Sequence, residues 1–324
     1  MSRSYVSFFL LLVPAAAAAP SSAASQVLWI DPEDIASRQI FYGPGGELHQ
    51  PRGVFHFVNE DRGGTNPKFI VADQDGVKWT VKLGAEARPE TAASRLIWGA
   101  GYFADEDYLV RSLRVMNMPA HLRRGQKFVD RDGALHDVRL KRHIPELKKI
   151  SDWSWSENPF VDTRELNGLR VLMALVNNWD LTDENNAIAG LPDSERRVYL
   201  VSDVGSTFGS GNLNWPLKRG RGDLHAYAHS HFIDRVHGDF VDFHIPSRPS
   251  LFFLATPREF MAKMRLRWIG KHIPRSDARW IGELLDRIPP DHIRDAFYAS
   301  GYPPDEVGEA VKTIRDRIAA LNAL

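Results

Sequence analysis

The chain has 324 residues, and its charge is balanced, with 41 Lys and Arg against 41 Asp and Glu. Its hydrophobic share of 43% and charged share of 25% are typical of a globular protein with one large or two smaller domains, which excludes a disordered or low-complexity chain. Balanced charge argues against a general nucleic-acid binder, because such a protein needs excess positive charge to displace counterions from phosphates. The chain has no Cys, which excludes disulfides, thiolate nucleophiles and zinc sites with thiolate ligands.

Residues 1–25 are typical of a secretory signal peptide. Arg3 supplies a short positive region, residues 6–13 are almost wholly apolar, and small residues dominate residues 15–25. The apolar stretch is shorter than the roughly 20 residues that span a bilayer. We therefore expect an exported chain, in a periplasm, outside the cell or in a secretory lumen, with no stable membrane span after cleavage. An uncleaved membrane anchor is the alternative.

Residues 26–150 show the pattern of a β-rich domain. Runs of β-branched and aromatic residues at 54–58, 68–72 and 77–83 predict strands. The sequence Asp-Gln-Asp-Gly at 73–76 predicts a hairpin turn, because Asp-Gly tolerates the positive φ that tight turns need.

Residues 151–324 show mainly helical spacing. One apolar stripe predicts a helix that begins at Asp162 or Thr163, and a second helical region covers about residues 257–324. The apolar positions are Leu166, Leu169, Met173 and Val176 in the first helix, and Ile281, Leu285, Ile288, Val307, Val311, Ile314 and Ile318 in the second region. The sequence therefore predicts an α+β protein with a β-rich N-terminal domain and a helical C-terminal domain.

Oxygen-bearing side chains follow the first helix. Asn185 comes five residues after Asp180, and Asp203 ends a later apolar run. Phosphoryl transfer requires such a set, since one carboxylate orients the attacking hydroxyl while an amide and a second carboxylate hold Mg²⁺ against nucleotide phosphates. Asn186 is an alternative metal ligand, although the five-residue interval favours Asn185.

These motifs resemble those of the protein-kinase superfamily. Asp180-Leu181-x-x-x-Asn185 is similar to the D-L-x-x-x-N catalytic loop, and Asp203-Val204-Gly205 is similar to the D-F-G element. The resemblance implies a two-lobed kinase-like fold, with a β-rich nucleotide-binding lobe and a helical catalytic lobe, that binds ATP and Mg²⁺ or Mn²⁺ in its cleft. It also implies that Asp180 orients the acceptor hydroxyl and that Asn185 and Asp203 bind the metal.

The resemblance implies a lysine–glutamate pair in the first lobe. Lys82 comes late in an apolar strand, as does the kinase lysine that holds the α and β phosphates. Glu90, one residue after Pro89 at the start of a helical segment, is placed to pair with Lys82. Glu86 is an alternative partner.

A glycine-containing turn precedes the lysine strand. Gly63 and Gly64 lack the Cβ that would keep backbone amides away from a phosphate, and Lys68 is a further phosphate contact or a flanking surface charge. The segment 63–68, Gly-Gly-Thr-Asn-Pro-Lys, is similar to the G-G-x-x-P-K segment of HipA-type toxin kinases, an atypical branch. The likeness covers about residues 55–210. It departs from ordinary kinases at 178–179, where Asn-Trp replaces His-Arg, and at Val204, which replaces phenylalanine.

The motifs together predict an exported atypical kinase that transfers the γ-phosphate of ATP to a hydroxyl group of a protein or small-molecule acceptor. Two alternatives are a catalytically inactive kinase fold used for binding or as a scaffold, and a nucleotidyl transferase on the same fold. Segments 108–118 and 138–144 are both candidates for the hinge that contacts adenine.

The same polar residue types also serve ordinary structural roles in folded proteins. Asp180 and Asp183 are typical helix caps, and Lys82 alone is typical of a solvated strand residue. His225 and His229, four residues apart, can ligate zinc on one helix face. Because no Glu stands beside them in an H-E-x-x-H arrangement, surface positions or polar contacts within the fold are the alternative for both histidines.

Overall fold

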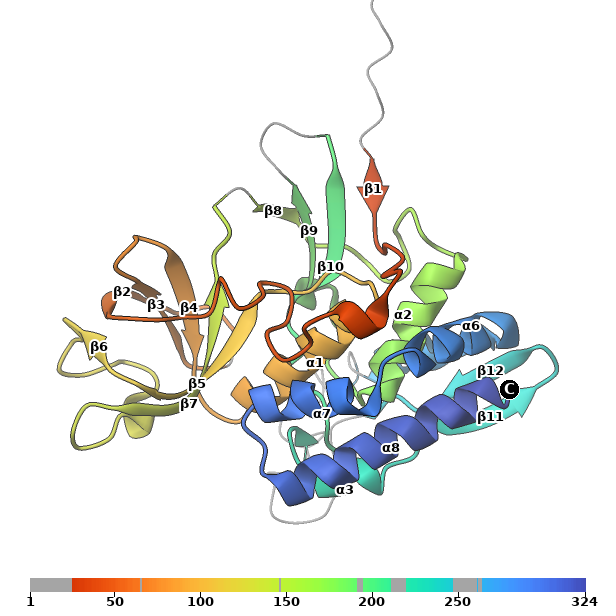
Figure 1. Cartoon of the computed structure of the whole chain (residues 1–324). Helices are drawn as coiled ribbons and strands as arrows, with labels where there is room; N and C mark the ends of the chain where they lie inside the picture. Colours follow the sequence, from red (N-terminus) through yellow and green to blue (C-terminus); the bar gives the residue numbers. More distant parts are fainter. Residues whose placement is uncertain are drawn as a thin grey trace, which may run out of the picture.

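The structure is a computed structural model that describes residues 25–64, 66–145, 147–190, 195–210, 220–246, 261 and 264–324. Figure 1 shows a β-rich N-terminal region on the left and a group of C-terminal helices on the right, with one helix, α1, between them. The predicted α+β class, with these two regions in this order, is confirmed. The predicted signal peptide lies outside the described residues, apart from residue 25. Within the described ranges, no helix is both long and apolar enough to cross a membrane.

The N-terminal sheet has six strands in the order β5-β7-β4-β3-β2-β6. Its strands are β2 (Phe55–Asp61), β3 (Lys68–Ala72), β4 (Lys78–Lys82), β5 (Asp107–Leu113), β6 (Val115–Met116) and β7 (Leu135–Arg142). Helix α1 (Ala87–Gly99) contacts β5 and β7. The three predicted strands are therefore confirmed: β3 has the predicted bounds, and the ends of β2 and β4 are shifted by one to three residues.

The β3–β4 hairpin sets the register of the lysine strand. Its turn is the predicted one: Gly76 has a φ of +78°, and Asp73 Oδ1 accepts hydrogen bonds from the backbone N–H groups of Asp75 and Val77 at 3.0 and 2.9 Å. The resulting antiparallel register pairs Lys68 with Lys82. Both lysines therefore lie at the end of the sheet that carries the glycine turn.

The C-terminal helices begin where the sequence provides start signals. Thr163 caps α2 by accepting a hydrogen bond from the Leu166 N–H at 3.2 Å. From Arg275 onward, the predicted region 257–324 forms three α-helices, because Pro290 and Pro304 suit the first turn of a helix but cannot continue the preceding one. The helices are α2 (Arg164–Leu175), α3 (Leu224–Ala228), α6 (Arg275–Asp286), α7 (Pro290–Ala299) and α8 (Pro304–Asn322).

Two smaller sheets and several short 3-10 helices complete the described fold. One sheet has the order β1-β10-β9-β8 and lies beside the N-terminal sheet, and the other has the order β11-β12-β13. The strands are β1 (Gln26–Val27), β8 (Lys148–Ser151), β9 (Asn186–Gly190), β10 (Arg197–Val201), β11 (Ile233–His237), β12 (Phe240–Phe243) and β13 (Ile273–Pro274). The 3-10 helices are η1 (Ile35–Ser37), η2 (Gln126–Phe128), η3 (Asp183–Asn185) and η5 (Leu266–Gly270).

Arg317 of α8 fastens the end of α2 to the rest of the helical region. Its guanidinium is buried and donates hydrogen bonds to the Leu175 carbonyl at 2.7 Å, to Asn177 Oδ1 at 2.9 Å and to Ser230 Oγ at 2.7 Å. The last carbonyl groups of a helix have no partner within the helix, and the Leu175 carbonyl is satisfied from outside α2 by Arg317 together with the Tyr227 hydroxyl. These hydrogen bonds fix the position of the C-terminal end of α2, and with it the start of the segment that includes Asp180.

Arg317→Ala is expected to lower the free energy of unfolding by about 3 kcal/mol, because it removes three buried hydrogen bonds and leaves Asn177 Oδ1 without the donor that Arg317 provides. Urea unfolding followed by circular dichroism measures this loss. Arg315→Ala is the control on the same helix, since Arg315 pairs with Asp286 at the surface and such pairs contribute about 0–1 kcal/mol. Equal losses in the two variants would contradict the role assigned to Arg317.

Candidate active site

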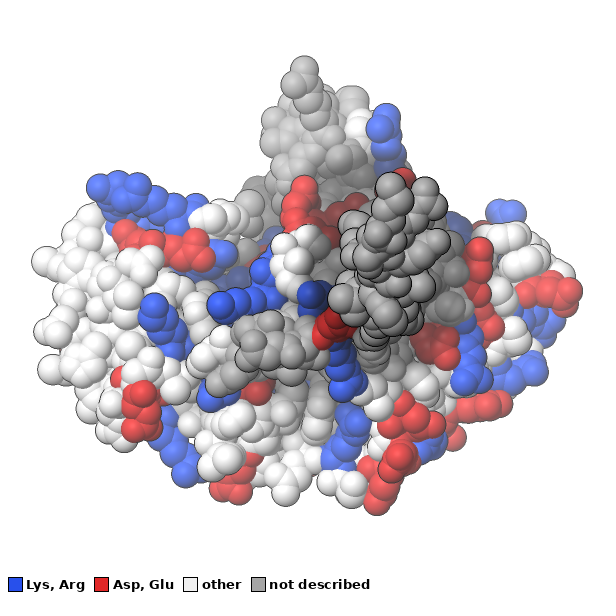
Figure 2. Space-filling model, turned by 90° about the horizontal axis from the view of Figure 1, so that it is seen from above, with Lys and Arg blue, Asp and Glu red and all other residues white. Residues whose placement is uncertain are grey.

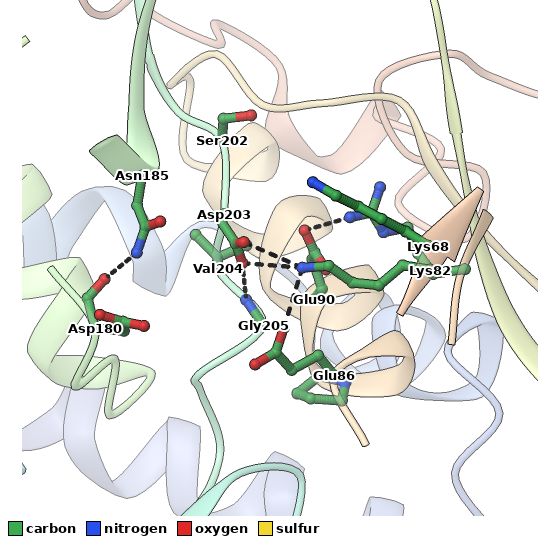
Figure 3. Close-up of polar contacts among 12 residues, drawn as sticks. Lys68, Lys82, Glu86, Glu90, Asp180, Asn185, Ser202, Asp203, Val204 and Gly205 are labelled. Carbon is green, nitrogen blue, oxygen red and sulfur yellow. Dashed lines mark hydrogen bonds and ion pairs between the residues drawn. The ribbon is translucent and has the colours of Figure 1, made fainter. Parts of the chain in front are cut away.

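One buried lysine is surrounded by three carboxylates at the end of the lysine strand (Figure 3). Lys82 Nζ lies 3.1 Å from Glu86 Oε2, 2.8 Å from Glu90 Oε2 and 3.1 Å from Asp203 Oδ1. The lysine comes from the last position of β4, the two glutamates flank the start of α1, and Asp203 follows β10. Three segments far apart in the sequence therefore meet at one ammonium group.

Both glutamates considered as partners of Lys82 contact it. They stand four residues apart, which is about one helical turn, so both point from the start of α1 toward β4. Glu86 also forms an ion pair with Arg221, and Glu90 forms one with Arg139 at 2.7 Å. Each carboxylate is thus held by two cations.

Arg139 of β7 extends the cluster into the interior, and sequence reasoning did not find it. Its guanidinium lies between Glu90 and Asp107, with Nη1 3.1 Å from Asp107 Oδ1, and all three side chains are buried. In β7 the neighbours Val138 and Leu140 are buried as well, because they point to the opposite face of the sheet and pack in its apolar core, while α1 covers the face that Arg139 occupies. In the sequence, Arg139 stands within an apolar run, but an arginine in such a run is also typical of a half-exposed strand, so the pattern alone did not identify it as buried.

Burial and the charges of the cluster oppose each other at its carboxyl groups, and the pKa values of Asp203 and Asp107 shift in opposite directions as a result. Burial alone would raise the pKa of Asp203, but the Lys82 ammonium, followed by Arg139, outweighs burial and holds it below its ordinary value. Burial raises the pKa of Asp107 to about 7 against the lowering effect of Arg139. No described residue donates a hydrogen bond to either oxygen of Asp107, which agrees with that rise. Asp203 is therefore ionised at neutral pH, and its side chain is 45% exposed.

Asp180 and Asn185 lie on the opposite side of Asp203 from Lys82 (Figure 3). The Asn185 side-chain amide donates to the Asp180 carbonyl at 2.6 Å, which leaves its Oδ1 available as a ligand. The Asn185 carbonyl accepts the backbone N–H groups of Ser202 and Asp203 at 2.8 and 3.2 Å. The structure thus places Asn185 directly beside Asp203, as the metal hypothesis requires.

The alternative ligand Asn186 occupies a different environment. It is fully buried, and its amide donates to the Trp153 carbonyl at 2.9 Å. This hydrogen bond between β9 and the loop around Trp153 is a structural one, so the geometry favours Asn185 of the two.

The glycine turn lies at the same end of the sheet as Lys82. Gly64 has a φ of +66°, which a residue with a Cβ adopts only with strain, and Gly63 N–H donates to Asp61 Oδ1 at 2.8 Å. Lys68 Nζ forms an ion pair with Asp61 at 3.2 Å. The Leu83 N–H donates to the Pro67 carbonyl at 3.0 Å and ties the turn to the lysine strand. Residue 65 of the turn lies outside the described residues.

A cavity of about 580 Å³ opens at the other end of β4. Its lining includes Lys78, residues 141–145 and an apolar group formed by Ala187, Ala189 and Leu200. Of the two hinge candidates, segment 138–144 contributes to this lining, whereas no residue of 108–118 is among the lining residues. Because a strand rises about 3.3 Å per residue, β4 carries the chain about 13 Å from Lys78 at the cavity to Lys82 at the carboxylates.

The lining of this cavity also includes a polar triad that sequence reasoning missed. Ser202 Oγ donates to Asp105 Oδ2 at 2.6 Å, and Lys141 Nζ lies 3.1 Å from the same oxygen. These residues are far apart in the sequence and match no motif, so nothing in the sequence brings them together.

Comparisons with known proteins find similar solved structures but no relatives by sequence. No protein-family model and no curated protein matches the chain. A Helicobacter pylori proinflammatory kinase, CtkA, is 11% identical with a TM-score of 0.47, over 84% of this chain and 97% of that one. The Golgi casein kinase is 12% identical with a TM-score of 0.41, over 84% of this chain and 71% of that one. A structure of the Golgi casein kinase with Mn/ADP bound is 12% identical with a TM-score of 0.34, over 83% of this chain and 75% of that one.

Identities and scores are low throughout, so the case for a particular activity rests on the geometry of this chain's own residues.

The raised pKa of Asp107 predicts a pH dependence of stability. Between about pH 4, the pKa of an unfolded Asp, and about pH 7, the folded chain binds a proton at Asp107 that the unfolded chain has lost. This contribution to the free energy of unfolding is fully present below that window and is lost as the pH rises through it. Asp107→Asn, which cannot ionise, should therefore show a less steep decline than the wild type across the window. Urea unfolding at a series of pH values measures the two slopes, and identical slopes would show that the pKa of Asp107 is not raised.

Proposed function

We propose that the chain is an exported, ATP-dependent phosphotransferase of the kinase type, which moves the γ-phosphate of ATP to a hydroxyl group of a protein or small-molecule acceptor. The observation that carries the proposal is the convergence of Lys82, Glu90 and Asp203 at one end of a strand whose other end borders a cavity with an apolar lining. A nucleoside triphosphate matches these two ends, because it has a flat base at one end and charged phosphates at the other.

The adenine ring fits the cavity, where Ala187, Ala189 and Leu200 offer apolar contacts and residues 141–145 offer backbone groups for hydrogen bonds. The phosphates extend along β4 toward Lys82. There the lysine holds the α and β phosphates, and the amides of Gly63 and Gly64 approach them from the glycine turn once the Gly63 N–H exchanges its hydrogen bond to Asp61 for a phosphate oxygen.

The donor set beside Lys82 fits Mg²⁺ or Mn²⁺. Asp203 is ionised and half-exposed, and the Asn185 Oδ1 beside it is a second hard oxygen donor. Carboxylate oxygens of Glu86, Glu90 and Asp203 also lie within 4.8 Å of one another. When bound, the metal neutralises charge that develops on the phosphates during transfer.

The chain's own residues then position the acceptor. Asp180 accepts or orients the proton of the attacking hydroxyl, and Glu90 keeps Lys82 in place against the phosphates. Arg139 is a positioning residue, since it acts on Lys82 through Glu90. Orientation and charge neutralisation supply most of the acceleration, so no covalent intermediate on the protein is needed.

Two further considerations support this proposal over its alternatives. The chain retains the lysine, both aspartates and the amide together, which argues against an inactive scaffold. Lys and Arg residues lie interspersed with Asp and Glu over the described part of the face in Figure 2, so that part of the face offers no uniformly basic surface for nucleic acid. Export rests on the leader-like residues 1–25.

Two aspartate variants separate catalysis from nucleotide binding. ATP with Mg²⁺ should raise the melting temperature of the wild type, and the protein should consume ATP. Asp203→Asn should lower turnover at least about 100-fold and should remove the part of the melting-temperature increase that depends on Mg²⁺. Asp180→Asn should lower turnover to a similar extent but keep the full increase in melting temperature. Asp291→Asn on α7, whose side chain is 83% exposed, is the control and should resemble the wild type.

The outcomes of this experiment distinguish the candidate functions. The proposal would be overturned if ATP with Mg²⁺ does not raise the melting temperature of the wild type and the wild type does not consume ATP. Nucleotide binding without turnover would indicate a scaffold, and mass spectrometry of the labelled product would reveal a nucleotidyl group in place of a phosphoryl group.

Filling the cavity should weaken nucleotide binding without touching the charged cluster. Ala189→Phe places a ring on the apolar lining, and we expect it to raise the Kd for ATP by about tenfold or more, since it excludes the base. Val236→Phe, at an exposed position of β11, is the matched control. Isothermal titration calorimetry measures both, and an unchanged Kd for Ala189→Phe would place the base elsewhere.

A further inference from the structure

A second group of metal-ligating side chains lies between α3 and α8, two helices that run side by side at the bottom of Figure 1. His225 lies in α3, His229 directly follows it, and Glu309 lies in α8. One nitrogen of each imidazole and one carboxylate oxygen all lie within 4.8 Å of one another. This group shares no residue with the proposed phosphotransfer site.

We propose that His225, His229 and Glu309 bind a divalent transition-metal ion, with Zn²⁺ as the best match, and that the bound ion clamps α3 to α8. Two imidazoles and one carboxylate form a donor set that suits zinc, whereas Mg²⁺ prefers oxygen ligands only. Three protein ligands leave a fourth tetrahedral position for water.

The distance between two of these groups already matches that of zinc ligands. His225 Nδ1 lies 3.2 Å from Glu309 Oε1. Tetrahedral zinc with bonds of about 2.0–2.1 Å holds neighbouring ligand atoms about 3.3–3.4 Å apart. The third group requires only a small rotation, because the ring centroids of His225 and His229 are 4.5 Å apart and both side chains are exposed at the surface.

The hydrogen bonding of His229 leaves the correct nitrogen available. Its Nδ1 lies 2.9 Å from the His225 backbone carbonyl, and a carbonyl can only accept a hydrogen bond. Nδ1 therefore carries the proton, and in the neutral ring the lone pair lies on Nε2. Histidines that ligate metals commonly donate their other N–H to a carbonyl or a carboxylate in this way.

Further charged groups lie near the site. Burial raises the pKa of Glu306, its neighbours Asp305, Asp223 and Glu309 raise it further, and Arg88 opposes them. Asp316 lines the adjoining cavity together with Lys312 and Arg317, so the nearby charge is of both signs. A cavity of about 510 Å³, which His229 and Glu309 help to line, leaves space for a water molecule on the bound ion.

A clamp here has a structural purpose. Helix α3 has five residues, too few for a helix to be stable by itself, and only Asp223 caps its start among the described residues, by accepting the Ala226 N–H at 2.9 Å. The residue two positions before that cap, Arg221, forms the ion pair with Glu86 beside Lys82. An ion that fixes α3 to α8 would therefore steady this segment, whatever reaction the cleft performs.

The proposal is tested by titrating the metal-free full chain with ZnCl₂ in a calorimeter, and with Co²⁺ as a spectroscopic probe. We expect saturable binding of one Zn²⁺ at this site, and for Co²⁺ the strong visible absorption of a four-coordinate ion. His229→Ala and Glu309→Gln should each weaken zinc binding by at least about tenfold. Circular dichroism and the melting temperature without zinc confirm that each variant is folded.

Two controls separate this site from other zinc-binding groups. His231→Ala, an exposed histidine outside the group, should bind zinc as the wild type does. Repeating the titration with Asp203→Asn removes a ligand from the cleft and should leave this binding intact. Absent zinc binding, or binding of equal strength in the wild type, His229→Ala and Glu309→Gln, would overturn the proposal, and neither result depends on whether the chain transfers phosphate.

Discussion

A buried ammonium group needs compensating charge, and the way in which Lys82 obtains it organises the rest of this molecule. Its three carboxylate partners come from α1 and from the segment after β10, so the N-terminal sheet, α1 and the C-terminal region are joined at one point. Removing two charges from water is costly, and an ion pair in the interior persists only where further partners complete it. Glu86 and Glu90 meet this condition through Arg221 and Arg139. Asp203 is the most exposed of the three carboxylates, and it is therefore the one that can exchange its contact with Lys82 for a metal ion.

The same requirement explains why the cluster continues inward to Arg139 and Asp107. A glutamate that serves only Lys82 would be free to rotate, whereas the second ion pair with Arg139 fixes both of its oxygens. Asp107 in turn lies beside Arg139, but burial raises its pKa and no described residue donates a hydrogen bond to its oxygens, whereas Lys82 and Arg139 lower the pKa of Asp203. Two aspartates near one set of cations thus differ in pKa because Asp107 is buried in the interior, whereas the side chain of Asp203 is 45% exposed.

Local signals account for the parts of the fold and site that could be predicted. Asp-Gly at the hairpin, Thr163 at the start of α2 and the alternating apolar residues around Lys82 each act through neighbours in the chain, and the structure has the corresponding turn, cap and strand. The helical region predicted from apolar spacing is helical in the structure, but the spacing did not show that α6, α7 and α8 are separate helices, divided at Pro290 and Pro304. Periodicity reports which face is buried, but the fixed φ of proline decides where one helix stops and the next begins.

The sequence alone determined the kinds of groups available: a strand lysine, early helix glutamates, an Asp–Asn pair five residues apart, a late aspartate and two histidines one helical turn apart. Only the tertiary structure decided that Glu86 and Glu90 both contact Lys82, that Asn185 rather than Asn186 lies beside Asp203, and that Glu309 completes the histidine pair. The physical reason is that the interaction between two charges depends on their separation in space and not on their separation along the sequence. The period of a helix or strand decides which residues share a face of that element. The side chains that contact this face come from other segments, whose positions depend on how the whole chain packs.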